Sequence, residues 1–183
     1  GAYASSLDQI GPMTQNVEDA AILYDIISGS DDKDSTNAKM DDKVCEKLNP
    51  DRKLTIAVLP HYINDASEDV KNAYAKAIEA LKSTGHTIVE REMMDAKFDI
   101  SAYYITATAE ATTNLARYDG IRYGNRVEGK NLQDTFIQTR SNGFGDEVKR
   151  RIMLGNFVLS SGYYEAYYVK AQKTRHIIKD NYN

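Results

Sequence analysis

The sequence predicts an α/β fold, and three consecutive segments support this prediction. Residues Leu54–Leu59 form a short, apolar, partly β-branched run, which is typical of a buried strand. Residues 67–84 have the apolar spacing of a helix, and His86–Glu92 return to a strand pattern. Strand, helix and strand in this order form a β-α-β unit, which requires a parallel pair of strands joined by a right-handed crossover.

The composition is that of a globular protein with a hydrophobic core. Of the 183 residues, 42% are hydrophobic and 27% are charged, and the formal net charge is −4. This balance argues against disorder and against a free-standing nucleic-acid binder, which is normally basic. The single cysteine, Cys45, excludes an internal disulfide framework, and a run as short as Leu54–Leu59 cannot span a bilayer. No signal-peptide pattern is visible, so we expect a cytoplasmic protein without a membrane partner.

The first predicted helix begins at Val17. Asn16 can cap its amino end, because a short polar side chain there accepts a hydrogen bond from the first turn. Gly29 is a natural stop, because glycine readily adopts the backbone conformation that ends helices. The predicted apolar face of this helix consists of Val17, Ala20, Ala21 and Tyr24. The next segment, Ser30–Asp51, is polar, and we expect a surface loop there with a short helix near Val44–Leu48.

The helix of the β-α-β unit follows Ser67, which can cap it, and ends at Gly85. Glu68 and Asp69 lie in its first turn, where the helix dipole favours negative charge. Its predicted buried face consists of Val70, Ala73, Tyr74, Ala77 and Leu81.

The rest of the chain is predicted to be mainly helical. After Asp99, one helix face is formed by Tyr104, Ala107, Ala111 and Leu115. The pair Asp119-Gly120 indicates a turn. Further helices are predicted over Leu132–Arg140 (ended by Asn142-Gly143), Asp146–Leu154 (ended by Gly155) and about Tyr163–Ile178. In the last of these helices, the i, i+4 neighbours are Tyr163/Tyr167 and Tyr164/Tyr168.

Charge is unevenly distributed along the sequence. Residues 1–120 carry 12 basic and 21 acidic side chains, a net charge of −9, whereas residues 121–183 carry 11 basic and 6 acidic ones, a net charge of +5. Seven of the 13 tyrosines lie at or after Tyr118. A basic, tyrosine-rich segment can contact RNA through stacking and phosphate pairing. Packed tyrosines and solvated cations explain the same pattern more simply, and we favour that interpretation.

No motif in the sequence identifies a catalytic centre. The three histidines lie in different predicted elements without the spacing of metal ligands, so we expect no metal site; they are His61, His86 and His176. Neither a glycine-rich phosphate loop nor a nucleophile elbow is present. The serine pairs Ser5-Ser6 and Ser160-Ser161 lack a neighbouring glycine-rich loop that could form an oxyanion hole, which favours a structural role for both.

The run Lys149-Arg150-Arg151 follows two acidic residues at helical spacing. Asp146/Arg150 and Glu147/Arg151 are i, i+4 pairs, each worth about 0.3–0.5 kcal/mol when exposed. Alternatively, one of the arginines faces inward and holds a ligand carboxylate with its planar fork of donors. Considered without further context, the residues favour the exposed ion pairs.

Longer tracts of the sequence resemble a known family. The run Ala4–Pro12, followed by the helix start Val17–Ala20, is similar to the segment just downstream of the amidase signature. Other tracts resemble, more narrowly, the family of A subunits of glutamyl-tRNA(Gln) amidotransferases: Asn114–Arg117, Asp119–Gly124, Gly143–Gly155 and Ser160–Tyr168. The resemblance runs through nearly the whole chain and covers well under half of the family's chain.

The resemblance implies an amidase-signature fold, a mixed β-sheet covered by helices. Residues 1–183 would form the downstream part of this amidase domain. The family's catalytic set consists of a serine nucleophile, a second serine with a cis peptide and a lysine base, all of which lie upstream of Ala2. The resemblance therefore assigns no catalytic residue to this sequence, and we expect the segment alone to be inactive.

The resemblance also implies an activity and a set of partners. In the family, the A subunit hydrolyses glutamine to glutamate and ammonia within a heterotrimer with subunits B and C. The ammonia travels to the B subunit, which uses ATP and Mg²⁺ to convert Glu-tRNA(Gln) to Gln-tRNA(Gln). The complex is thus a ligase of protein biosynthesis, and this segment would meet misacylated tRNA only indirectly. No cofactor is expected within the segment itself.

Two residues of this sequence match the wall of the family's glutamine pocket. They are Tyr103 and Arg151, with Tyr104 and Arg150 as the adjacent alternatives. The guanidinium would clamp the α-carboxylate of glutamine, and the phenol would order the ligand. An acidic partner for the substrate amine is expected beyond Asn183.

Two other functions fit the same sequence. The segment could be a non-catalytic interaction module that docks partner subunits or tRNA, or it could belong to a plain amidase that hydrolyses another small amide. In each case we expect it to expose apolar surface that the rest of the family's chain covers.

Overall fold

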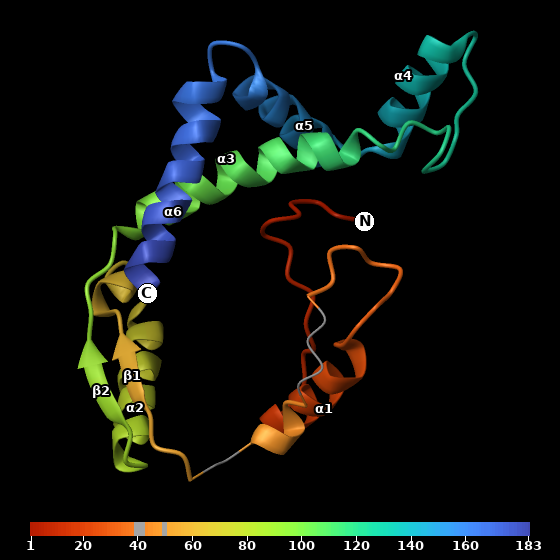
Figure 1. Ribbon diagram of the computed structural model, residues 1–183. Coiled ribbons are helices and arrows are strands. Elements are labelled where there is room, and N and C mark those ends of the chain that lie inside the picture. Colours follow the sequence, from red (N-terminus) through yellow and green to blue (C-terminus); the bar gives the residue numbers. More distant parts are fainter. Residues whose placement is uncertain (39–42, 49–50) are drawn as a thin grey trace. The chain divides into compact units, whose positions relative to one another are not determined.

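The computed structural model describes residues 1–38, 43–48 and 51–183. Figure 1 shows the described helices and strands along the chain. The chain divides into two compact units. The sheet unit comprises the described part of residues 9–58 together with residues 68–89, and the helical unit comprises residues 1–8, 59–67 and 90–183.

The predicted β-α-β unit is present in the sheet unit. Strand β1 (Thr55–Val58) is followed along the chain by helix α2 (Glu68–Ser83) and strand β2 (Thr87–Glu90). The two strands are hydrogen-bonded neighbours, and their arrows point the same way in Figure 1, so the pair is parallel. This arrangement confirms the α/β class.

Gly85 ends α2, as predicted. Its backbone is left-handed, with a φ of 88°. The Gly85 N–H donates to the Lys82 carbonyl at 2.9 Å, and the His86 N–H donates to the Leu81 carbonyl at 3.1 Å. These two bonds form the paired helix-terminating motif for which glycine is the preferred residue.

The burial predicted for this unit is partly wrong. In β1, Val58 is buried and Ile56 half-buried, but Thr55 and Ala57 are exposed, because alternate side chains of a strand point to opposite faces and a two-stranded sheet is not covered on both. No residue of α2 is buried. The predicted members Val70, Ala73 and Ala77 are exposed, whereas the half-buried stripe consists of Lys71, Tyr74, Ile78 and Leu81.

Helix α1 (Val17–Ile27) begins where the sequence predicts. The Asn16 side chain accepts a hydrogen bond from the Asp19 N–H at 2.8 Å. Of its predicted apolar face, Ala21 is buried and Val17 is 72% exposed. The predicted short helix is a 3₁₀ turn, η1 (Cys45–Lys47), while residues 39–42 and 49–50 of the surrounding loop lie outside the described residues.

The helical unit confirms the helical second half. It contains a 3₁₀ turn, η2 (Pro60–Ile63), a π-helical segment, η3 (Tyr164–Val169), and four α-helices: α3 (Ala96–Leu115), α4 (Leu132–Gly143), α5 (Asp146–Leu159) and α6 (Lys170–Tyr182). Helix α3 begins earlier than predicted, because the Asp95 carboxylate caps it by accepting from the Lys97 N–H at 3.0 Å. The predicted turn at Gly120 is present, with a φ of 78°.

Small residues make the core of this unit. The buried residues of α3 are Ala102, Thr106, Ala107, Thr108, Ala109, Ala111 and Asn114. The predicted face of α3 is therefore right at Ala107 and Ala111, but Tyr104 is 50% exposed and Leu115 is only half-buried. Small side chains allow helix backbones to approach one another closely, and here the backbone of α3 approaches that of α5.

Two predicted helix ends are wrong. Helix α5 continues through Gly155 to Leu159, and α4 includes both Asn142 and Gly143. Gly155 is buried inside α5, where a Cβ atom would lie 2.0 Å from Thr112 Oγ1 and 2.1 Å from the Thr108 carbonyl oxygen of α3. The glycine therefore marks a close helix crossing and not a helix end.

Apolar side chains are exposed on the sheet unit. Ile10 and Met13 are 97% and 96% exposed, and Ile26 of α1 is 70% exposed. Within the described ranges, no helix is both long and apolar enough to cross a membrane.

Candidate functional site

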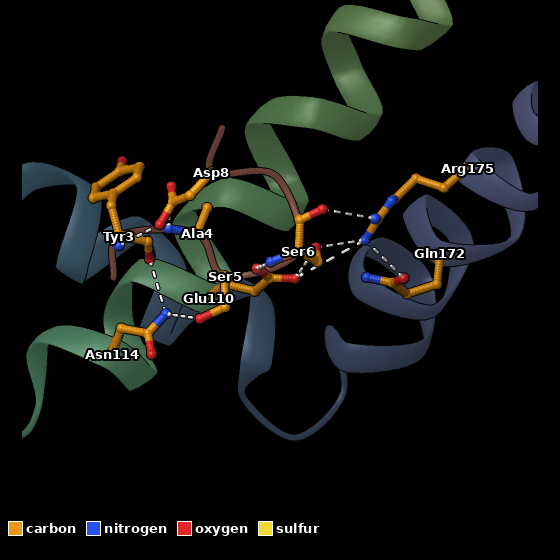
Figure 2. A network of polar contacts seen from close by, with 9 residues as sticks. All are labelled: Tyr3, Ala4, Ser5, Ser6, Asp8, Glu110, Asn114, Gln172 and Arg175. Carbon is orange, nitrogen blue, oxygen red and sulfur yellow. Dashed lines mark hydrogen bonds and ion pairs between the residues drawn. The ribbon is translucent and has the colours of Figure 1, made fainter. Parts of the chain in front are cut away.

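The segment Tyr3–Asp8 is tied to helix α3 by a network of polar contacts (Figure 2). The Asp8 carboxylate accepts from the backbone N–H groups of Tyr3 and Ala4 at 2.9 and 3.0 Å, which closes the segment into a turn. The Asn114 amide of α3 donates to the Tyr3 carbonyl at 3.1 Å and to Ser5 Oγ at 2.8 Å. Because Asn114 is only 8% exposed, these bonds fix the backbone of the segment against the core.

Ser6 makes a second set of contacts to the helices. The Glu110 carboxylate of α3 accepts from the Ser6 N–H at 2.9 Å and from its hydroxyl at 2.5 Å. Arg175 of α6 donates to Ser6 Oγ at 2.9 Å and lies 3.9 Å from the Glu110 carboxylate. Figure 2 shows Ser6 between these two charged side chains. Both serines are thus engaged in holding the segment, which agrees with the structural role predicted for this pair.

A hollow of about 420 Å³ lies beside this network. Its wall combines polar groups with aromatic rings, and its residues are Ser5, Ser6, Ala109, Glu110, Thr113, Asn114, Leu159, Tyr164 and Tyr168. The rings of Tyr164 and Tyr168 lie 5.3 Å apart, and those of Tyr163 and Tyr167 lie 6.0 Å apart, so both predicted i, i+4 pairs are in contact. Four polar side chains of the wall bond to one another in pairs, Ser6 to Glu110 and Ser5 to Asn114.

Arg151 is the inward-facing member of the arginine pair on α5. Its side chain is 30% exposed, whereas that of Arg150 is 77% exposed. Arg151 Nε donates to Glu147 Oε1 at 2.8 Å, and Nη1 donates to the Tyr3 hydroxyl at 3.0 Å. The bonds to Tyr3 and Glu147 raise the pKa of Arg151 above its already high ordinary value, so the guanidinium stays charged. Conversely, the bonds from Arg150 and Arg151 lower the pKa of Glu147.

One of the two predicted ion pairs is present. Glu147 and Arg151 form the i, i+4 pair, at 2.8 Å. The Asp146/Arg150 prediction is wrong, because Arg150 also pairs with Glu147 and Asp146 instead lies 3.6 Å from Lys149 Nζ. The longer glutamate side chain reaches both arginines, while the shorter aspartate at the start of the helix remains fully exposed.

The structure does not bring Tyr103 and Arg151 together. Thr112 Oγ1 donates to the Ile152 carbonyl at 2.9 Å, and Gly155 lies against Thr108, so α3 and α5 run antiparallel. Arg151 is therefore opposite residue 113 or its neighbours, about 15 Å along α3 from Tyr103 at 1.5 Å per residue. Tyr103 is 44% exposed and Tyr104 50% exposed, with their rings 5.3 Å apart, so exposure does not separate these two alternatives.

Two other residues singled out in the sequence, Ser160 and His86, make hydrogen bonds to the backbone. Ser160 Oγ donates to the Phe157 carbonyl at 2.7 Å at the end of α5, in agreement with a structural role. His86 Nδ1 accepts from the Leu54 N–H at 3.2 Å. Among the residues whose placement is described, no three histidine, cysteine or acidic side chains converge as metal ligands would.

The parallel β-α-β unit is consistent with the amidase-signature fold that the amidase-like tracts imply. A model of the amidase family matches residues 1–183. The chain therefore belongs to the amidase family.

Particular relatives are closer still. The A subunit of glutamyl-tRNA(Gln) amidotransferase from Sulfurimonas denitrificans is 82% identical over 183 residues, which are 100% of this chain and 41% of the relative. The protein of the same name from a Nitratiruptor species is 67% identical and is likewise covered over 41% of its length. The crystal structure of the A subunit from Thermotoga maritima is 36% identical with a TM-score of 0.63, over 98% of this chain and 35% of that one. The chain thus spans about two fifths of the length of these curated relatives.

Sequence reasoning found Glu147 as a partner of Arg151 but missed the distant residues that hold Arg151 and the Tyr3–Asp8 segment. Tyr3, Glu110 and Asn114 make the long-range contacts, with partners more than 100 residues away. One signal could have found two of them, because Glu110 and Asn114 lie at i, i+4 spacing in the stretch 106–114 of α3, whose other residues are all alanine or threonine. No comparable signal in the sequence marks Tyr3.

Proposed function

We propose that this chain forms part of the glutamine-hydrolysing subunit of a tRNA-dependent amidotransferase. The observation that carries the proposal is the 82% identity, over all of this chain, to a protein named as the A subunit of glutamyl-tRNA(Gln) amidotransferase. Identity at this level over long tracts favours the amidotransferase over a plain amidase for other small amides. Because the chain spans 41% of that relative, the activity proposed is that of the complete subunit.

In this proposal the complete subunit hydrolyses glutamine, and the ammonia serves a partner subunit that converts Glu-tRNA(Gln) to Gln-tRNA(Gln). The partners are subunits B and C of a cytoplasmic heterotrimer, and ATP and Mg²⁺ are used by the B subunit. No residue of this chain is assigned as nucleophile or base. This chain contributes part of the fold and part of the substrate wall.

The proposed role of Arg151 is to bind the α-carboxylate of glutamine. Its guanidinium is charged, partly shielded from solvent and held at two of its nitrogens. A guanidinium oriented in this way presents parallel N–H groups that match a carboxylate. Tyr103 is proposed as a second wall residue on the family resemblance alone.

The test is a glutaminase assay on the complete glutamine-hydrolysing subunit in its complex with subunits B and C. Glutamine should be hydrolysed in clear preference to a panel of other small amides. Equal hydrolysis of unrelated amides would support the plain amidase instead. The 183-residue chain is assayed alone in parallel, and we expect it to hydrolyse no glutamine. If it binds subunits B and C but the complete complex has no glutaminase activity, the chain is a docking module.

A further inference from the structure

Tyr3 is the long-range support of Arg151. Its hydroxyl accepts a hydrogen bond from Arg151 Nη1 at 3.0 Å, and the centre of its ring lies 5.9 Å from the guanidinium carbon. The contact joins residues 148 positions apart in the chain and is partly buried. A hydrogen bond to a charged donor in such a place is stronger than one between neutral groups.

Tyr3 can act as a support because its own backbone is held at both ends. Its N–H donates to the Asp8 carboxylate at 2.9 Å, and its carbonyl accepts from the buried Asn114 amide of α3 at 3.1 Å. The phenol is thus anchored through α3, while Arg151 lies on α5. If the guanidinium of Arg151 moved, its hydrogen bond to the Tyr3 hydroxyl would break, because Tyr3 is anchored to a different helix.

The hydrogen bonds from Arg151 to Glu147 and Tyr3 use only part of its guanidinium donors. Glu147 takes Nε and Tyr3 takes one proton of Nη1. Among the described residues no hydrogen bond is made by Nη2, so both of its protons and the second Nη1 proton remain. A carboxylate that binds side by side to the two terminal nitrogens engages one N–H of each, and each of the two nitrogens retains at least one.

We propose that Tyr3 is a positioning residue for the carboxylate clamp, holding the Arg151 guanidinium in the orientation that receives the α-carboxylate of an amino-acid substrate. This inference rests on the proposed function, since it deepens the role given there to Arg151. Tyr3 acts through Arg151 and takes no part in the cleavage of the amide. Its loss should weaken the binding of substrates with an α-carboxylate and should leave the chemical step unchanged.

The test compares two substrates in the complete subunit with its partners. L-glutamine carries the α-carboxylate, and 4-aminobutanamide has the same amide and amine without it. For Tyr3→Phe, which keeps the ring and removes the hydroxyl, KM for L-glutamine should rise roughly five- to tenfold with kcat within about twofold. The use of 4-aminobutanamide, measured as hydrolysis or as competition with L-glutamine, should not change. The control is Tyr123→Phe, because Tyr123 is 54% exposed and lies outside this network.

A double-mutant cycle with Arg151→Lys tests whether Tyr3 acts through Arg151. The KM effect of Tyr3→Phe should largely disappear when Arg151 is already lysine. Additive effects, an equal loss on both substrates or an unchanged KM for L-glutamine would each overturn the inference. The failure of the proposed function looks different, because the unmodified complex would then show no preference for L-glutamine over 4-aminobutanamide.

Discussion

Gly155 on α5 lies directly against Thr112 on α3, with no room for a side chain between them. A Cβ atom at Gly155 would be 2.0 Å from Thr112 Oγ1, and the same hydroxyl donates to the Ile152 carbonyl at 2.9 Å. Two helix backbones are thus joined at a point where one supplies a glycine and the other a hydrogen bond. This crossing fixes the position of α5 along α3. It therefore also fixes the position of Arg151, which lies one turn before Gly155.

Gly155→Ala should destabilise the protein. The added methyl group has to displace Thr112 and the Thr108 carbonyl, which belongs to the rigid backbone of α3. We expect the free energy of unfolding in urea to fall by about 3 kcal/mol, at the upper end of the usual cost of overpacking. Gly143→Ala is the matched control, because a Cβ atom there meets nothing within 4 Å. Gly143 lies at the end of α4, where alanine should leave stability unchanged or raise it by up to about 1 kcal/mol.

Arg151→Lys and Arg150→Lys should have different effects on glutamine hydrolysis by the complete complex. Lysine keeps the charge but lacks the planar fork, so at position 151 we expect KM for glutamine to rise about tenfold with little change in kcat. At position 150 the side chain is 77% exposed, and we expect KM to remain as in the unmodified protein. The reverse pattern would identify Arg150 as the residue that binds the α-carboxylate. An unchanged KM in both variants would mean that neither arginine binds it.

Glu110→Gln should loosen the Tyr3–Asp8 segment. Glutamine retains one acceptor oxygen for Ser6 but loses the second acceptor and the charge facing Arg175. We expect the Ser6 amide proton to exchange faster with solvent, and the free energy of unfolding to fall by about 1–2 kcal/mol. As a control, Glu128→Gln breaks an exposed ion pair with Arg126 and should change stability by less than about 0.5 kcal/mol. Unaltered exchange at Ser6 would mean that Glu110 does not hold the segment.

The contact between Tyr62 and Asp99 should make stability depend on pH in the alkaline range. The Tyr62 hydroxyl donates to Asp99 Oδ2 at 2.6 Å, and this bond, with partial burial, raises the pKa of Tyr62 to about 12. In the unfolded chain tyrosine ionises near pH 10. The stabilisation is therefore fully present below about pH 10 and is lost as the pH rises towards about 12.

Tyr62→Phe supplies the comparison for this prediction. The difference in tyrosinate absorbance between the two proteins should show one group with a pKa of about 12. The fall in unfolding free energy between about pH 10 and 12 should be smaller in the variant, because its side chain has no proton to lose. If Tyr62 instead ionised near pH 10, the value of tyrosine in an unfolded chain, the prediction would be wrong.

Several local features could be predicted from the sequence because their partners lie within a few residues. The Asn16 cap bonds to Asp19, and Gly85 ends α2 through carbonyls of the turn before it. The β-α-β order and the helical second half follow from the periodicity of apolar residues, which is also local. The family resemblance depended in the same way on contiguous runs of residues.

The residue faces and the site were decided by tertiary structure. Gly155 has the sequence signature of a helix end, and only the approach of α3 makes it an interior residue. Arg150 and Arg151 are chemically identical neighbours, and since adjacent helix positions differ by about 100° around the axis, packing alone decides which one turns inward. Tyr3 becomes its partner across 148 positions of chain, a distance over which no pattern of spacing operates. The sequence by itself thus determined the order of the elements, the caps at Asn16 and Gly85, and the family, because these depend on residues close together in the chain. The fold decided which side chains meet, because that depends on how whole helices cross.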